Sequence, residues 1–188
     1  MGQRYDERRS EIRIGNVVIM EKEIVNKVAQ SSLMIFDLED YYPKETRTNI
    51  DISQWLYEGF ILKEKEFRAE LQSIDWSVYQ DHLVAINCST GAILPSWTFM
   101  LVSSYLQPYA KMVVQGNLHQ LDLAFYQKII DTLDFSIYQD KPIIIKGCAK
   151  KPIPEEAYAM ATQKMMNYAR SIMFGEACSS VPIYKRKK

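Results

Sequence analysis

Short apolar runs alternate with longer amphipathic stretches through the second half of the chain. The short runs have the length of β-strands and end at glycines, cysteines or polar residues, at Leu83–Asn87, Lys111–Gln115, Pro142–Lys146 and Ser171–Phe174. The stretches between them predict helices over Ser96–Tyr105, Leu118–Leu133 and from Pro154 through Tyr168. Strands that are apolar throughout bury both faces, and their alternation with helices predicts a parallel α/β sheet with right-handed crossovers.

The first third of the chain has a weaker pattern. We predict a strand over Ser32–Leu38, a short strand or helix lead-in over Asn49–Ile52, and helical structure over Gln54–Phe60. Lys63–Ser73 predicts a helix, because Phe67 and Leu71 share one face and the charges occupy the other. A small antiparallel sheet is the alternative for this region.

A repeat with an offset of 59 residues organises the larger part of the chain. Residues 75–116 and 134–175 align without a gap and share ten identities in 42 positions. We interpret this as an internally duplicated βαβ half. The predicted fold is α/β: a mainly parallel sheet with helices on both faces, plus a small N-terminal α/β extension. A doubly wound single sheet would place the first strand of each half side by side at its centre.

Composition predicts an ordinary water-soluble protein. The 188 residues are 47% apolar and 24% charged, and 23 basic residues balance 23 acidic ones, so no global field favours nucleic acid or an anionic membrane. No apolar run approaches the roughly 20 residues that span a bilayer, and the N-terminal residues do not form the apolar region of a signal peptide, so we expect a cytoplasmic location. Residues 1–19 predict a disordered or non-native arm, residues 20–188 a single domain, and the basic ending a solvated, frayed terminus.

Three cysteines follow predicted strands at their carboxyl ends, where α/β folds bind ligands. Cys88 follows the first repeat strand, Cys148 the third, and Cys178 lies three residues past Gly175. The offset of 59 makes His119 the counterpart of Cys178. Three thiolates and an imidazole suit a tetrahedral zinc site, and three thiolates with one variable ligand suit an iron–sulfur cluster.

Two other interpretations of these residues remain open. Cysteines after strands often serve as small buried hydrophobes, and His119 fits an ordinary histidine near a helix N-terminus. Alternatively, Cys88 or Cys148 is a nucleophile activated at a helix N-terminus, with His119 as the plausible base. Asp37, Glu39 and Asp40 could supply carboxylates to the same edge, although loop acids are more often solvated. The glycine patterns of phosphate-binding loops are absent.

Three segments resemble an uncharacterised family found mainly in Bacteroidetes, the domain-of-unknown-function family DUF2480. They are Ile86–Trp97, Ile145–Pro154 and Gly175–Lys185, and the resemblance extends over about Met20 to Lys187. It implies a role beside SUF-type iron–sulfur cluster assembly, with the three cysteines matching the family's motifs. Relatives often carry an acidic residue at Gly91 and another residue at His119, which implies three thiolates with an exogenous fourth ligand.

These observations lead to three hypotheses. The first is a cytoplasmic accessory protein that binds zinc or an iron–sulfur cluster through Cys88, Cys148 and Cys178, with His119 as a candidate fourth ligand and iron–sulfur assembly proteins as partners. The second is a thiol-dependent enzyme or sulfur carrier. The third is a non-catalytic interaction module with structural cysteines, in the form of a homodimer.

Overall fold

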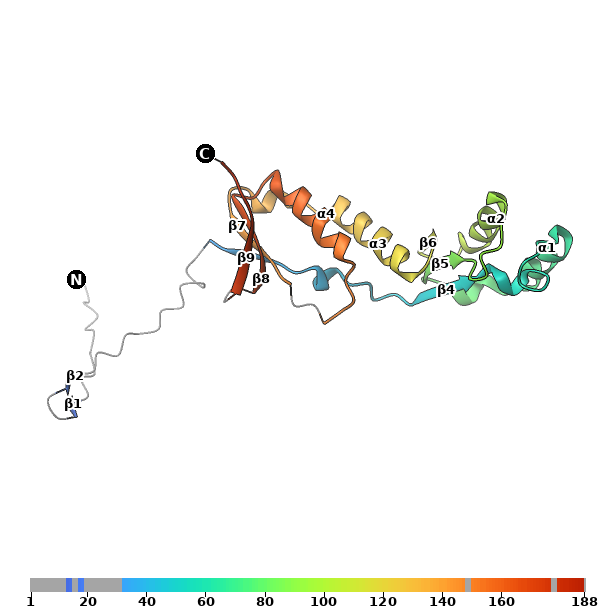
Figure 1. Ribbon diagram of the computed structural model, residues 1–188, viewed down its shortest axis with the longest axis horizontal. Helices are drawn as coiled ribbons and strands as arrows, with labels where there is room; N and C mark the ends of the chain where they lie inside the picture. Colours follow the sequence, from blue (N-terminus) through green and yellow to red (C-terminus); the bar gives the residue numbers. More distant parts are fainter. Residues whose placement is uncertain (1–12, 15–16, 19–31, 148–149, 177–178, 188) are drawn as a thin grey trace, which may run out of the picture. The chain divides into compact units, whose positions relative to one another are not determined.

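The computed structural model describes residues 13–14, 17–18, 32–147, 150–176 and 179–187 (Figure 1). The chain divides into two compact units, Met1–Ser31 and Ser32–Lys188. In the first unit, β1 (Arg13–Ile14) pairs antiparallel with β2 (Val17–Val18). Most of the predicted N-terminal arm lies outside the described residues, so the domain boundary predicted at residue 20 stays a prediction.

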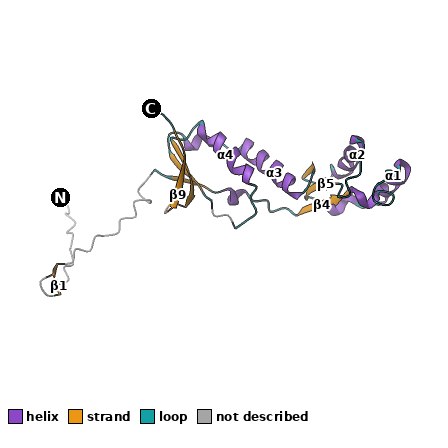
Figure 2. Cartoon of the chain, in the orientation of Figure 1, coloured by secondary structure: helices purple, strands orange, loops and turns teal. Residues whose placement is uncertain are grey.

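The second unit alternates strands with helices, as Figure 2 shows. In chain order its elements are β3 (Met34–Phe36), β4 (Arg47–Asp51), α1 (Glu64–Ser73), β5 (Leu83–Asn87), α2 (Ser96–Leu106), β6 (Met112–Gln115), α3 (Leu118–Thr132), β7 (Pro142–Ile145), α4 (Glu155–Met166), β8 (Ser171–Glu176) and β9 (Ser179–Lys185). Short 3-10 helices precede or follow several strands, at η1 (Leu38–Tyr41), η2 (Ile52–Trp55), η3 (Trp76–Tyr79) and η4 (Phe135–Tyr138). None of the helices described is long and apolar enough to cross a lipid bilayer.

The strands of this unit form two separate sheets. One has three parallel strands in the order β4-β5-β6, and the other has the order β3-β7-β8-β9, with β9 antiparallel. The predicted α/β class with mainly parallel strands is therefore confirmed. The expectation of one doubly wound sheet is wrong, because β5 and β7 do not pair. An apolar strand must bury both of its faces, but its sequence does not identify its neighbours.

Strand β5 is buried on both faces of the three-stranded sheet. Val84 and Ile86 belong to a core that also contains Phe67 and Leu71 of α1 and Val102 of α2. On the opposite face, the alternate β5 residues, at positions 83 and 85, pack against α3 at position 121. This double burial explains why the strand is apolar without interruption.

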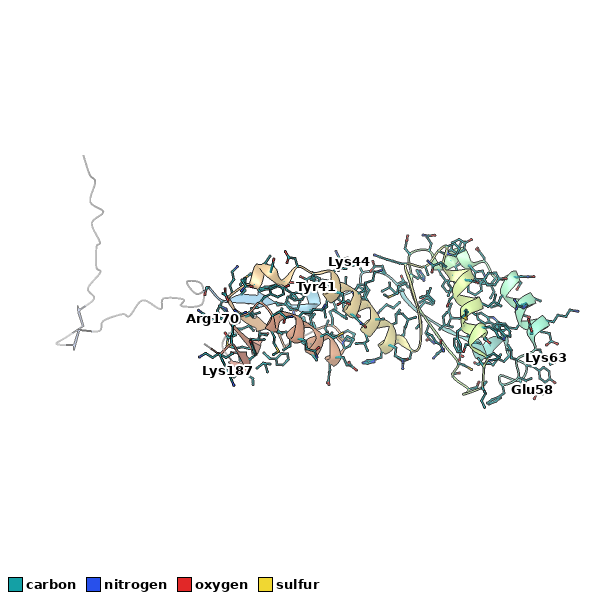
Figure 3. All side chains as sticks on the ribbon, turned by 90° about the horizontal axis from the view of Figure 1, so that it is seen from above. Tyr41, Lys44, Glu58, Lys63, Arg170 and Lys187 are labelled. Carbon is teal, nitrogen blue, oxygen red and sulfur yellow. The ribbon has the colours of Figure 1, made fainter. Side chains whose placement is uncertain are left out.

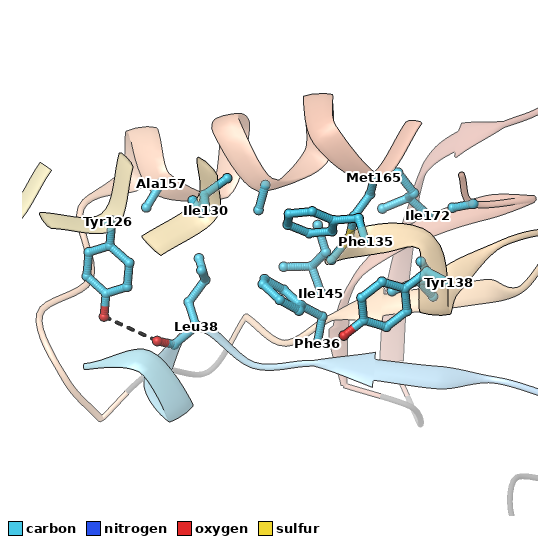
Figure 4. Close-up of a cluster of buried hydrophobic side chains, with 13 residues drawn as sticks. Phe36, Leu38, Tyr126, Ile130, Phe135, Tyr138, Ile145, Ala157, Met165 and Ile172 are labelled. Atoms are coloured by element: carbon cyan, nitrogen blue, oxygen red, sulfur yellow. Dashed lines mark hydrogen bonds between the residues drawn. The ribbon is translucent and has the colours of Figure 1, made fainter. Parts of the chain in front are cut away.

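The four-stranded sheet packs one face against α3 and α4 (Figure 4). Ile143 and Ile145 of β7 and Ile172 of β8 are at most 1% exposed. Tyr126 of α3 lies in the same core, and its hydroxyl donates a hydrogen bond to the Leu38 carbonyl oxygen at 3.2 Å. This buried bond ties α3 to the segment that follows β3.

The elements recur at the offset of 59 residues that the sequence shows. Helices η3 and η4 begin at Trp76 and Phe135, and α2 and α4 begin at Ser96 and Glu155. Unusual backbone angles recur as well, since Asp81 and Asp140 have φ of 61° and 56°. The duplication remains our interpretation of this agreement.

Two local predictions need correction. The helix predicted over Gln54–Phe60 is only the short η2, because Glu58 and Gly59 have φ of 51° and 77°, which an α-helix cannot accommodate. The C-terminus does not fray at Arg186, whose backbone N–H donates to the Arg170 carbonyl at 2.9 Å and whose guanidinium pairs with Asp140.

Candidate functional site at the strand ends

Cys88, which follows β5, lies in a packed loop. Its side chain is half-buried against the core of the three-stranded sheet, and its sulfur is 3.4 Å from the Thr90 hydroxyl oxygen. Thr90 in turn donates to the Gly59 carbonyl at 2.6 Å. These contacts are those of a cysteine that helps to hold its own loop in place.

The same loop is anchored by an aspartate from the neighbouring strand. Asp51, at the end of β4, accepts hydrogen bonds from the backbone N–H groups of Ser53 at 3.0 Å and Ser89 at 3.1 Å, and from the Ser89 hydroxyl. Burial would raise the pKa of Asp51, but these hydrogen bonds outweigh it and lower the pKa from 3.8 to about 2. Asp51 is therefore a charged structural anchor.

The equivalent end of the four-stranded sheet holds a charged cluster of different composition. The Lys146 ammonium, one residue past β7, donates to Asp37 Oδ2 at 2.6 Å, and Asp37 Oδ1 accepts from the Glu39 backbone N–H at 2.9 Å. The hydrogen bond that Lys146 donates to Asp37 raises the pKa of Lys146, and the negative charges of Asp37, Glu176 and Glu39 raise it further. This strand edge therefore combines an ion pair with two further carboxylates.

Glu39 fixes the segment that follows Cys148. Its carboxylate accepts hydrogen bonds from the backbone N–H groups of Lys150 and Lys151, the second at 3.0 Å. The Lys151 ammonium lies 4.7 Å from the centre of the Tyr42 ring, a cation–π distance. Asp37 and Glu39 are thus engaged at the strand edge that the sequence predicted for them.

A partly buried ion pair lies next to this region. The guanidinium carbon of Arg47, on β4, lies 5.2 Å from the centre of the Tyr42 ring. Its Nη1 donates a hydrogen bond to Asp122 Oδ2 of α3 at 2.7 Å. Burial would lower the pKa of Arg47, but the hydrogen bond and charge of Asp122 raise it. Within the described part of the chain, the second oxygen, Asp122 Oδ1, is buried without a hydrogen-bond partner. Sequence reasoning missed this pair, because its members are 75 residues apart and carry no motif.

The structure describes two of the four predicted ligands, Cys88 and His119. His119, in the first turn of α3, is half-exposed, and its Nε2 lies 3.5 Å from a carboxylate oxygen of Glu156 on α4. Cys148 and Cys178 lie outside the described residues. Among the residues that are described, no three His, Cys, Asp or Glu side chains gather closely enough to hold a metal.

The topology also separates the cysteines into two groups. Cys88 follows β5 in the three-stranded sheet, whereas Cys148 and Cys178 follow β7 and β8, which are neighbours in the four-stranded sheet. The expectation that all three cysteines follow strands of one sheet is therefore wrong. The ligand roles of the four residues remain predictions.

A cavity of about 310 Å³ opens at the opposite, amino end of β5 and β6. Its lining includes Tyr41, the last residue of η1, and Lys44, both labelled in Figure 3, and Phe125 and Ile129 of α3. Its rim carries charges of both signs, since Glu45 pairs with Lys111 there. We assign no ligand to a rim of such mixed charge.

Comparison with known proteins identifies the family to which the chain belongs. No curated protein and no solved structure matches the chain. The model of DUF2480, described as a protein of unknown function, matches residues 22–186, which include all the described elements of the second unit. The chain therefore belongs to the DUF2480 family.

Proposed function

We propose that this protein is a cytoplasmic accessory protein that binds zinc, iron or an iron–sulfur cluster through Cys148 and Cys178. The observation that carries the proposal is the pairing of β7 with β8. These strands are parallel neighbours, with Ile145 opposite Phe174, and each is followed within four residues by a cysteine. Neighbouring strands are about 4.8 Å apart, so loops from adjacent strand ends start within reach of one metal centre.

Nearby charges support the thiolate form that metal binding needs. Lys150 and Lys151 lie within three residues of Cys148 in the sequence, and cations close to a thiol favour its thiolate form. The Glu39 hydrogen bonds fix the backbone immediately after this cysteine. A reducing cytoplasm would keep both thiols available.

The proposal revises the predicted ligand set. Cys88 belongs to the other sheet and packs against Thr90, which favours a structural role. Two thiolates leave further metal positions to be filled by other donors. An incomplete set suits a protein that receives and passes on a metal or cluster, with iron–sulfur assembly proteins as its proposed partners.

The test is purification under anaerobic conditions, followed by elemental analysis and absorption spectroscopy. We expect bound zinc or iron in the wild type, a loss of at least tenfold in Cys148→Ser and in Cys178→Ser, and retention in the matched control Cys88→Ser. The absence of metal from the wild type, or loss in Cys88→Ser alone, would contradict the proposal.

A second candidate function is thiol chemistry at Cys148. Lys150 and Lys151, which follow it closely in the sequence, favour a reactive thiolate. Iodoacetamide labelling at neutral pH, followed residue by residue with mass spectrometry, should then modify Cys148 at least tenfold faster than Cys88. Equal and slow labelling of all three cysteines would exclude this alternative.

A further inference from the structure

Edge strands expose unpaired backbone N–H and C=O groups, and proteins usually protect them. In the part of the chain that the structure describes, the larger unit has edges at β3, β4, β6 and β9. An edge strand is usually protected by charged residues, by proline, by a bulge or by being very short.

Three of the edges carry such protection. Strand β4 begins at Arg47 and ends at Asp51, and β3 is only three residues long. Strand β9 contains Pro182, ends at Lys185 and has an irregular register opposite Ile172 and Met173. By contrast, β6 has the sequence Met-Val-Val-Gln, with no charge and no proline.

The β5–β6 register shows which β6 groups face outward. Ile86 lies opposite Gln115, and its carbonyl accepts from the Gly116 N–H at 2.8 Å. In a parallel pair of strands, a residue that is bonded in this way, here Ile86, forms its hydrogen bonds with the two residues on either side of its partner and not with the partner itself. The N–H and C=O of the partner, Gln115, therefore point away from β5. Because the backbone N–H and C=O groups of successive strand residues alternate in direction, those of Val113 also point away from β5.

The four-stranded sheet shows what covers the corresponding edge. Strand β8 occupies the place of β6 at the 59-residue offset, and β9 pairs antiparallel along its outer side. Ile172 and Phe174, the counterparts of Val113 and Gln115, lie opposite Tyr184 and Val181. No described strand does this for β6.

We propose that β6 pairs antiparallel with β6 of a second copy of this chain, which joins two three-stranded sheets into one of six strands. The uncharged β6 residues place no like charges opposite each other, and Val113 and Val114 supply β-branched cross-strand contacts. Lys111, which precedes the strand, is already paired with Glu45. The inference is independent of the cysteines and of the proposed function.

The test compares Gln115→Pro with the matched control Gln115→Ala by analytical ultracentrifugation of the full chain. Proline removes only an outward N–H that β5 does not use, and the Gln115 side chain is exposed. We expect wild type and Gln115→Ala to sediment as dimers and Gln115→Pro to dissociate at least tenfold more readily, with the same circular dichroism spectrum.

Hydrogen exchange provides a second measurement that does not depend on the folding of the variant. In wild type, the amides of Val113 and Gln115 should exchange at least tenfold more slowly at concentrations where the dimer forms than after dilution to monomer. A wild type that stays monomeric at all concentrations would overturn the proposal. The proposal would also be overturned if Gln115→Pro formed a dimer as tight as that of wild type, or if the exchange rates of the Val113 and Gln115 amides did not change with protein concentration.

Discussion

Replacing Asp51 with Asn removes the charge that anchors the loop after β5 while keeping the size of the side chain. The Asp51 carboxylate accepts two backbone N–H bonds and one hydroxyl bond, from Ser53 and Ser89. An amide retains one acceptor oxygen, so it keeps part of this network without the negative charge. The loop that carries Cys88 should therefore remain in place but be held less firmly.

The pKa of Asp51 sets the size of the expected effect. One pKa unit corresponds to about 1.4 kcal/mol, so the fall from 3.8 to about 2 corresponds to roughly 2.5 kcal/mol of unfolding free energy before solvent screening is considered. Asp51 is only half-buried, and solvent screening reduces the value to about 1 kcal/mol at neutral pH. We expect Asp51→Asn to lower the free energy of unfolding by that amount.

The pH dependence identifies the charge as the cause. Because folding lowers the pKa of Asp51, its stabilisation is complete above about pH 5 and disappears as pH falls through the folded value of about 2. The stability difference between wild type and Asp51→Asn should therefore be constant from pH 7 to 5 and fall to about half near pH 3.

Urea denaturation at pH 7, 5, 4 and 3 measures this difference. Glu70→Gln, which changes an exposed carboxylate on α1, is the control and should alter stability by less than about 0.5 kcal/mol. A difference that is as large at pH 3 as at pH 7, or that is absent at pH 7, would refute the reasoning.

Three further substitutions test the packing. Gly147→Ala places a Cβ 2.8 Å from the ring of Phe174, so the ring must move, and we expect a loss of about 1 kcal/mol in urea denaturation. Phe67→Ala opens a cavity at a fully buried position and should cost about 4 kcal/mol in the same assay. Arg186→Ala removes the pairing with Asp140 and the hydrogen bond to the Tyr168 carbonyl oxygen, and should speed hydrogen exchange along β9.

Most helices and strands of the larger unit could be predicted from the sequence, because the spacing of apolar residues within one segment indicates whether that segment is a helix or a strand. Leu83–Asn87 is observed as predicted, and α1 and α3 agree with their predicted bounds within one residue. Strand β9 was not predicted, because its exposed positions and Pro182 give no regular pattern. It forms because its backbone pairs with β8, which is a contact between segments and not a property of one.

Strand partners and the candidate site were harder to predict, for the same reason. The continuous apolar sequence of β5 requires cover on two faces, but α1 and α3, which lie outside the repeat that contains β5, supply it together with α2 of that repeat. The sequence placed Asp37 at a strand end, yet the choice of Lys146 as its partner follows from the β3–β7 register. A grouping of three cysteines at one edge depended on a strand order that periodicity does not encode.

Helix α3 has a consequence for how the larger unit melts. Its Leu121 closes one face of the three-stranded sheet, Tyr126 and Ile130 enter the core of the four-stranded sheet, and Phe125 contacts both groups. If α3 detaches, an apolar face of each sheet becomes exposed to water, which is unfavourable. We therefore expect the two sheets to be lost together on heating, and a cut between β6 and α3 should not release two independently stable halves.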